Sequence, residues 1–220
     1  MPATTLRLPE PHILRPAEIG LSISQQEITR LGAWIARNSV HQRAPHIHST
    51  SRDSRDHSWL RKTKPLLVPS EFTPPEDVAG LVRDLYDALH EPMQQFIRAP
   101  LEKITTRYAA SGHTHLPGDD AAEGHLDYYP SANFYTGRTN RGGKLLVAQT
   151  ASPRSVEQIR EEAYDVTPQP GTFLLFFGTI FPHCVDAIPA AATGARTCIN
   201  LTYSDGNPQD PSHPRFTSAR

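Results

Sequence analysis

The sequence predicts a mainly β protein whose helices precede its strands. Prolines are frequent, at 21 of 220 residues, roughly twice the average share of ~5%, and this disfavours a bundle of long helices. Apolar residues at helical spacing occur only between residues 24 and 100. After them come short apolar runs separated by Gly- and Pro-containing turns, a pattern typical of a β-sandwich or barrel with helices on one face.

The length and net charge of the chain narrow the class of protein further. A chain of 220 residues suits one domain with one buried core. The net charge of −1 gives no electrostatic footprint for nucleic acid or acidic membranes. No run approaches the ~20 apolar residues that cross a bilayer, and two cysteines exclude a disulfide scaffold and a four-Cys zinc site. We expect a cytoplasmic protein without nucleic-acid or membrane partners, and its oligomeric state stays open.

The first 70 residues predict an irregular extension with one helix. Ser24–Asn38 is the amphipathic stretch, with apolar residues at helical spacing: Ile28, Leu31, Trp34 and Ile35. Residues 41–64 are rich in His and Arg and poor in apolar residues. We interpret them as a long loop, or a lid that orders on a ligand.

Residues 71–103 predict supporting helices. Thr73-Pro-Pro-Glu76 has the form of a capping box with proline in the first turn. An apolar stripe follows, formed by Val78, Leu81, Val82, Leu85 and Leu89. Pro92 is expected to kink this helix or to restart it.

Residues 104–203 predict the β core, and residues 204–220 a loose polar tail. The turn signals include Asn140-Arg-Gly-Gly143 and Pro170-Gly171. Between such signals we expect strands near residues 103–110, 131–137, 143–150, 157–165, 172–177 and 195–203.

His125-Leu-Asp127 is the first motif with chemical meaning. Residues i and i+2 of a strand point to the same face, so an imidazole and a carboxylate would converge there. His183 follows 56 residues after Asp127, just past an apolar run, and Gly194-Ala-Arg196 opens the last expected strand. Two His and one carboxylate form the facial triad of non-haem Fe(II) oxygenases, which leaves three positions open. The planar fork of an Arg beyond them would suit a cosubstrate carboxylate.

From Tyr108 to Tyr203 the chain resembles the Fe(II)/2-oxoglutarate-dependent dioxygenases, particularly their prolyl-4-hydroxylase-like branch. Six landmarks of that branch follow one another in its order over about 95 residues. They are Arg107-Tyr108 with Gly112, His125-Leu-Asp127, Gly142-Gly143, Pro168-Gln-Pro-Gly171 with Phe176, His183, and Gly194-Ala-Arg196.

The resemblance implies a double-stranded β-helix, or jelly-roll, core and a role for each matched residue. His125, Asp127 and His183 would ligate Fe(II), with no catalytic residue beyond them. Arg196 would bind the C5 carboxylate of 2-oxoglutarate, with Tyr108 and Asn133 as further cosubstrate contacts. Cys198 stands where several branches have Ser or Thr, and the Ala-rich residues 190–192 are expected to bulge.

The implied reaction uses O₂ to decarboxylate 2-oxoglutarate to succinate and to oxidise an unactivated C–H bond. Hydroxylation of a small molecule, amino acid or peptide is the first expectation, and desaturation or ring formation is an alternative. Tyr129 and Arg138 are candidate substrate contacts. Two further alternatives are a cupin-type metalloenzyme that uses His113 and His115, and a jelly-roll that only binds a ligand.

Overall fold

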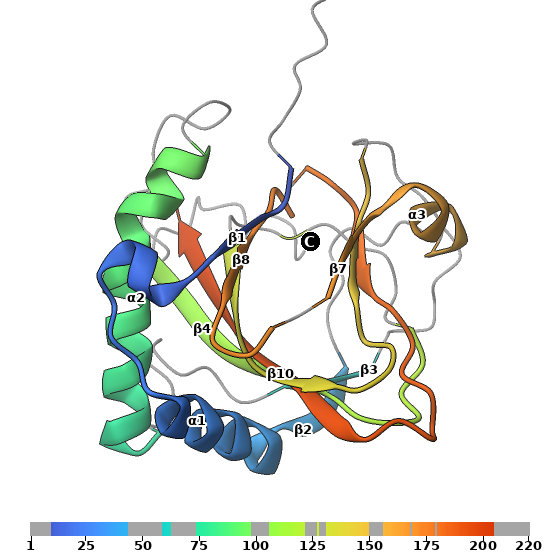
Figure 1. Ribbon diagram of the computed structural model, residues 1–220, viewed down its shortest axis with the longest axis horizontal. Helices are drawn as coiled ribbons and strands as arrows, with labels where there is room; N and C mark the ends of the chain where they lie inside the picture. The colour runs from blue at the N-terminus through green and yellow to red at the C-terminus, as the bar shows by residue number, and fades with distance from the viewer. Residues whose placement is uncertain are drawn as a thin grey trace, which may run out of the picture.

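The computed structural model describes residues 10–43, 59–62, 74–97, 106–121, 127, 131–149, 156–167, 169–178 and 180–204. Within them the chain is mostly β, with ten strands, three α-helices and one short 3₁₀ helix. The strands form two antiparallel sheets (Figure 1). No helix in these ranges has both the length and the apolar composition that a membrane span requires.

The larger sheet has seven strands in the order β1-β8-β5-β10-β4-β3-β2. Its two longest strands, β10 and β4, pair along nine registered positions, from Arg196 with His115 to Ser204 with Thr106. The bounds are β1 His12–Leu14, β2 Val40–Arg43, β3 Trp59–Lys62, β4 Thr106–His115, β5 Ser131–Thr139, β8 Phe173–Leu175 and β10 Gly194–Ser204. The predicted β core is therefore present, and the N-terminal segment adds three strands to it.

Helices α1 (Gln25–Asn38) and α2 (Glu76–Ile97) cover the outer face of this sheet (Figure 1). Ser24 begins α1 with a capping box, because its hydroxyl accepts from the Glu27 amide and its amide donates to the Glu27 carboxylate. The apolar stripes of both helices pack on outward side chains of the sheet, among them Phe134, Ile199 and Leu201. This cluster is the main core.

The smaller sheet, in the order β7-β6-β9, faces the other side of the larger one. Its strands are β6 Leu145–Val147, β7 Tyr164–Val166 and β9 His183–Val185. Helix α3 (Val156–Glu162) covers its outer face through Ile159, and the 3₁₀ helix η1 (Pro16–Ile19) lies near α2. An apolar set, called here the inner cluster, fills the space between the sheets: Tyr135, Leu145, Val147, Leu174, Phe176, Val185 and Cys198.

Three sequence predictions are wrong in detail. Within the described residues of 1–70 the chain is not irregular outside α1, because β1, β2 and β3 join the large sheet, and strand residues 41–43 and 59–62 fall in the predicted loop at 41–64. The strand expected at 157–165 is mostly α3, in which Ile159 is the buried residue among exposed ones. Pro92 does not restart the helix, because α2 continues as one helix through it to Ile97, so of the two outcomes expected at Pro92 the restart is wrong.

The expected turns are present. Gly142, Gly143 and Gly171 all have positive φ. The Ala-rich insert forms a turn in which the Ala192 amide donates to the Pro189 carbonyl at 2.9 Å. Thr73, proposed as a helix cap, and the tail from residue 205 lie outside the described residues.

Candidate active site

Strand alternation places a row of polar side chains between the sheets. On β5, Ala132 and Phe134 pack outward against the helices, so Ser131, Asn133 and Tyr135 face inward. On β10, Ile199, Leu201 and Tyr203 pack outward, so the inward residues are Arg196, Cys198 and Asn200.

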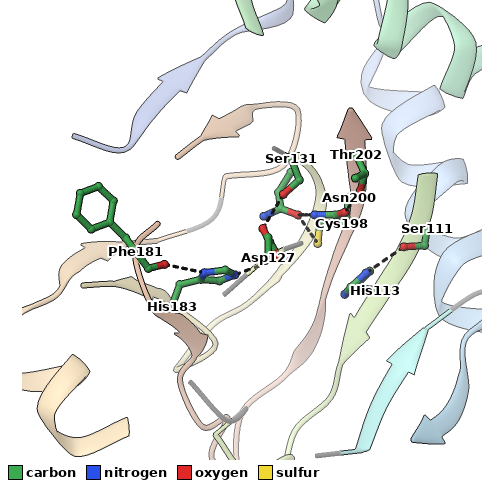
Figure 2. Close-up of polar contacts among 10 residues, drawn as sticks. Ser111, His113, Asp127, Ser131, Phe181, His183, Cys198, Asn200 and Thr202 are labelled. Atoms are coloured by element: carbon green, nitrogen blue, oxygen red, sulfur yellow. Dashed lines mark hydrogen bonds and ion pairs between the residues drawn. The ribbon is translucent and has the colours of Figure 1, made fainter. Parts of the chain in front are cut away.

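Asp127 and His183 meet at one end of this interior. Asp127 precedes β5, His183 begins β9, and Asp127 Oδ1 lies 3.6 Å from His183 Nε2 (Figure 2). The Asp127 amide donates to the Gly178 carbonyl at 2.7 Å, which ties it to the turn after β8. A cation with bonds of about 2 Å to nitrogen and oxygen ligands fits between two such atoms.

A hydrogen bond of His183 leaves its Nε2 atom able to bind a metal. Its Nδ1 atom lies 3.2 Å from the Phe181 carbonyl oxygen. A carbonyl only accepts, so Nδ1 carries the proton and Nε2 of the neutral ring keeps its lone pair. The ring is 4% exposed and meets the Phe176 ring edge-on at 4.8 Å. Orientation and tautomer both fit a metal ligand.

Arg196 lies farther along the same interior and is 2% exposed. Its Nη2 atom donates to the Tyr135 hydroxyl at 3.1 Å, Nη1 lies 3.9 Å from Cys198 Sγ, and the guanidinium carbon is 5.1 Å from the Tyr135 ring centre. In the described part of the chain Nε has no hydrogen-bond partner, and no carboxylate pairs with the group. A buried guanidinium without a counter-ion is costly, which indicates an anionic ligand.

Tyr135 completes a two-donor site with Arg196. Burial raises the pKa of Tyr135 to about 12, against the lowering influence of Arg196, so its hydroxyl keeps its proton at neutral pH. Burial lowers the pKa of Arg196, but Tyr135 and Cys198 more than offset this, and the pKa lies above its usual value. Because guanidinium only donates, the phenolic proton remains available for a ligand. Both groups can therefore donate to one carboxylate.

The other predicted contacts divide into three groups. Asn133 lies on the inner face, where its Oδ1 accepts from Asn200 Nδ2 at 3.2 Å and lies 3.9 Å from Cys198 Sγ. Arg138 is exposed and donates to Gln169 at 3.0 Å. His125, Tyr129 and the side chain of Tyr108 lie outside the described residues, so their predicted roles stay predictions.

The cupin-type alternative is contradicted by the placement of its ligands. His113 and His115 lie on β4, paired in register with Cys198 and Arg196 of β10, whereas His183 lies in the other sheet. No cluster of three potential ligands occurs in the described ranges, which include all three of these histidines. His113 instead contacts the Ser111 hydroxyl at 3.1 Å (Figure 2).

Three residues of the site were not predicted from the sequence: Tyr135, Ser131 and Gly178. Ser131 donates its hydroxyl to Asp127 Oδ2 at 2.8 Å. The sequence signal that could have identified Ser131 and Tyr135 is strand alternation, because both lie on the same face of β5 as Asn133 and alternate with apolar residues. Gly178 carries no such signal, since its role depends on a contact with a distant segment.

Comparison with known proteins identifies solved structures that share this fold. No protein-family model matches the sequence, and no curated protein matches it. Solved structures do match: a prolyl-4-hydroxylase from Pseudomonas putida has a TM-score of 0.55 at 15% identity, over 90% of this chain and 93% of that one. A 2OG-Fe(II) oxygenase family oxidoreductase from Burkholderia pseudomallei has a TM-score of 0.59 at 18% identity, over 90% and 86%.

A third similar structure is a prolyl hydroxylase from Trichoplax adhaerens in complex with a peptide fragment of the hypoxia inducible factor oxygen degradation domain. Its TM-score is 0.56 at 16% identity, over 89% of this chain and 83% of that one. The chain thus has the fold of the 2OG-Fe(II) oxygenases, as the sequence resemblance implied.

Proposed function

We propose that this chain is an Fe(II)- and 2-oxoglutarate-dependent dioxygenase with a double-stranded β-helix core. It oxidises an unactivated C–H bond, by hydroxylation, in a small molecule, amino acid or peptide. His125, Asp127 and His183 hold the iron, which supplies the activation of O₂ when bound. Both cysteines are free, which supports a cytoplasmic location.

The observation that carries this proposal is the buried, unpaired guanidinium of Arg196 in the interior that also holds Asp127 and His183. Ser131, beside Asp127, and Tyr135, beside Arg196, are four residues apart on one face of β5. That is about 13 Å of extended strand between the two Cα atoms. A five-carbon dicarboxylate, extended by a metal–ligand bond at one end and by hydrogen bonds at the other, can lie along it, with one carboxylate at the metal and the other on Arg196 and Tyr135.

Each group of residues around this ligand position has its own proposed role. Arg196 and Tyr135 bind and orient the far carboxylate. Asp127 and His183 hold the metal at the near end. The apolar side chains of the inner cluster, which come from both sheets, keep water away from the space between.

The test is turnover with reconstituted protein. Protein loaded anaerobically with Fe(II) and 2-oxoglutarate is exposed to O₂ with a panel of candidate substrates, and succinate and product masses are measured. We expect succinate formation coupled to a gain of one oxygen in one substrate. Loss of two hydrogens would indicate desaturation or ring formation. Binding of 2-oxoglutarate without succinate formation for any substrate would favour a binding protein.

Excess chloride in the same assay tests the role of Asp127. Iron halogenases of the resembling family replace this carboxylate by a small residue, which frees a position for chloride. Since Asp127 is present beside His183, we expect oxygen insertion, or loss of two hydrogens, rather than halogen transfer. A chlorinated product from the unmodified protein would show that Asp127 is not an iron ligand.

A further inference from the structure

The two carboxylate oxygens of Asp127 lie in different surroundings. Oδ1 faces the metal-binding nitrogen of His183 at 3.6 Å, whereas Oδ2 accepts the Ser131 hydroxyl at 2.8 Å (Figure 2). Ser131 is 2% exposed and begins β5, so a regular strand fixes the position of its hydroxyl. The two oxygens are therefore not equivalent as ligands.

Gly178 closes the space around Oδ2 from another side. A Cβ atom at this position would lie 2.3 Å from Asp127 Oδ2 and 3.0 Å from His183 Cε1. The Gly178 carbonyl also accepts from the Asp127 amide at 2.7 Å. The carboxylate thus packs against bare backbone, and turning Oδ2 toward the metal would break its bond with Ser131.

We propose that Ser131 is a positioning residue that makes Asp127 a ligand through Oδ1 alone. This inference rests on the proposed function, because it concerns how the iron is held. A carboxylate can bind a metal through one oxygen or through both. Binding through both would occupy one of the positions that the cosubstrate and O₂ require. A serine hydroxyl has one proton, and donating it to Oδ2 engages that oxygen in a charge-assisted hydrogen bond.

The experiment uses Co(II), whose visible absorption changes with coordination number, as the probe for the whole chain. Ser131→Ala is compared with the unmodified protein by Co(II) titration and by the spectrum of the loaded protein. Ser111→Ala is the matched control, because Ser111 is 6% exposed, lies on the same inner face and bonds His113 rather than Asp127. Thermal unfolding of each metal-free variant reports its folding.

In Ser131→Ala we expect Co(II) affinity to fall about 10-fold or more, the range found for partners that orient metal ligands. The spectrum should change as Oδ2 becomes free to bind, and Ser111→Ala should match the unmodified protein in both readouts. Unchanged affinity and spectrum in Ser131→Ala would overturn the inference. So would equal losses in both variants, which would indicate a general loss of packing. Failure of the unmodified protein to bind Co(II) or Fe(II) would instead refute the proposed function itself.

Discussion

Replacing Arg196 by Met separates cosubstrate binding from folding and from iron binding. Arg196 is 2% exposed, so a carboxylate that meets it loses its water as well. Met fills much of the same volume without a charge or a donor. The variant therefore removes the proposed anchor with little change in the shape of the interior.

The expected loss of affinity follows from the burial of the ion pair between Arg196 and the 2-oxoglutarate carboxylate. Removing one partner of a buried ion pair costs about 3–5 kcal/mol, and each tenfold change in affinity corresponds to about 1.4 kcal/mol. Binding of 2-oxoglutarate should weaken about 150- to 4,000-fold. The Tyr135 hydroxyl still donates to the ligand, which favours the lower part of this range.

The stability of the free protein should respond much less. The variant loses the bond to Tyr135, at about 0.5–1.5 kcal/mol or somewhat more for a charged donor, and the cation–π contact, at about 0.5–2 kcal/mol. It also relieves the unpartnered Nε, whose burial costs about 1–3 kcal/mol. Because these contributions oppose one another, we expect the free energy of unfolding to stay within about 1 kcal/mol of the original.

The assay is anaerobic calorimetric titration of Fe(II)-loaded protein with 2-oxoglutarate, paired with urea unfolding of the metal-free protein. Arg160→Met is the matched control, because Arg160 is an exposed residue that pairs with Asp186 at 2.8 Å on the outside of the fold. It should bind 2-oxoglutarate normally. Unchanged affinity in Arg196→Met would refute the reasoning and make another arginine, Arg107 or Arg138, the anchor.

Three further predictions concern the metal and the pH dependence. His183→Ala should lose Fe(II) binding in a metal titration and His113→Ala should keep it, and the reverse result would restore the cupin-type alternative. Gly178→Ala should weaken metal binding at least about tenfold, because its Cβ would lie 2.3 Å from a ligand oxygen, whereas Gly80→Ala, with its nearest atom at 3.7 Å, should not. Burial raises the pKa of Cys184 to about 11 from 9.0. The contribution of the buried neutral thiol to the free energy of unfolding is therefore complete below pH 9 and is lost between pH 9 and 11. Urea unfolding across this range should show a decline of about 2–3 kcal/mol that Cys184→Ala lacks, and an equal decline in both proteins would contradict it.

The sequence predicted the long elements because their signals are local. An 11-residue strand shows its own alternation, so the inward set that begins with Arg196 follows from the residue pattern of that strand alone. The amphipathic stripes of α1 and α2 were equally plain. Asp127 and His183 were found through residue types and spacing, and the fold brings them together.

The remaining features depend on partners far along the chain. Strands of three or four residues, such as β1 and β3, show no period of their own and form because a neighbouring strand offers hydrogen bonds. The contact between Tyr135 and Arg196 spans 61 residues and depends on the register of β5 against β10. Helix α3 has only seven residues and shows a weak helical pattern of apolar residues. Its structure is decided by helix propensity and by the packing of Ile159.

The pairing of β10 with one of its two neighbours is irregular beside Arg196. Against β4 the pairing is regular there, with Arg196 opposite His115. Against β5 the register shifts between Gly194 and Thr197 and again at Cys198. Arg196 and Cys198 still lie on one face, where their side chains are 3.9 Å apart, so the shift changes only which residues of β5 lie opposite β10.

Gly137 of β5 makes this irregularity possible. A Cβ at this position would lie 2.6 Å from Thr197 Oγ1 and 2.8 Å from the Ala195 carbonyl, so the two strands approach closely only where β5 has no side chain. Thr136 Oγ1 donates to Thr197 Oγ1 at 2.8 Å and fixes the same point from the outer face. Outward packing on the helices holds the rest of β10 in register. Arg196 thus faces the interior by the regular alternation of β10, and Gly137 lets β5 approach that strand closely where the register between them shifts.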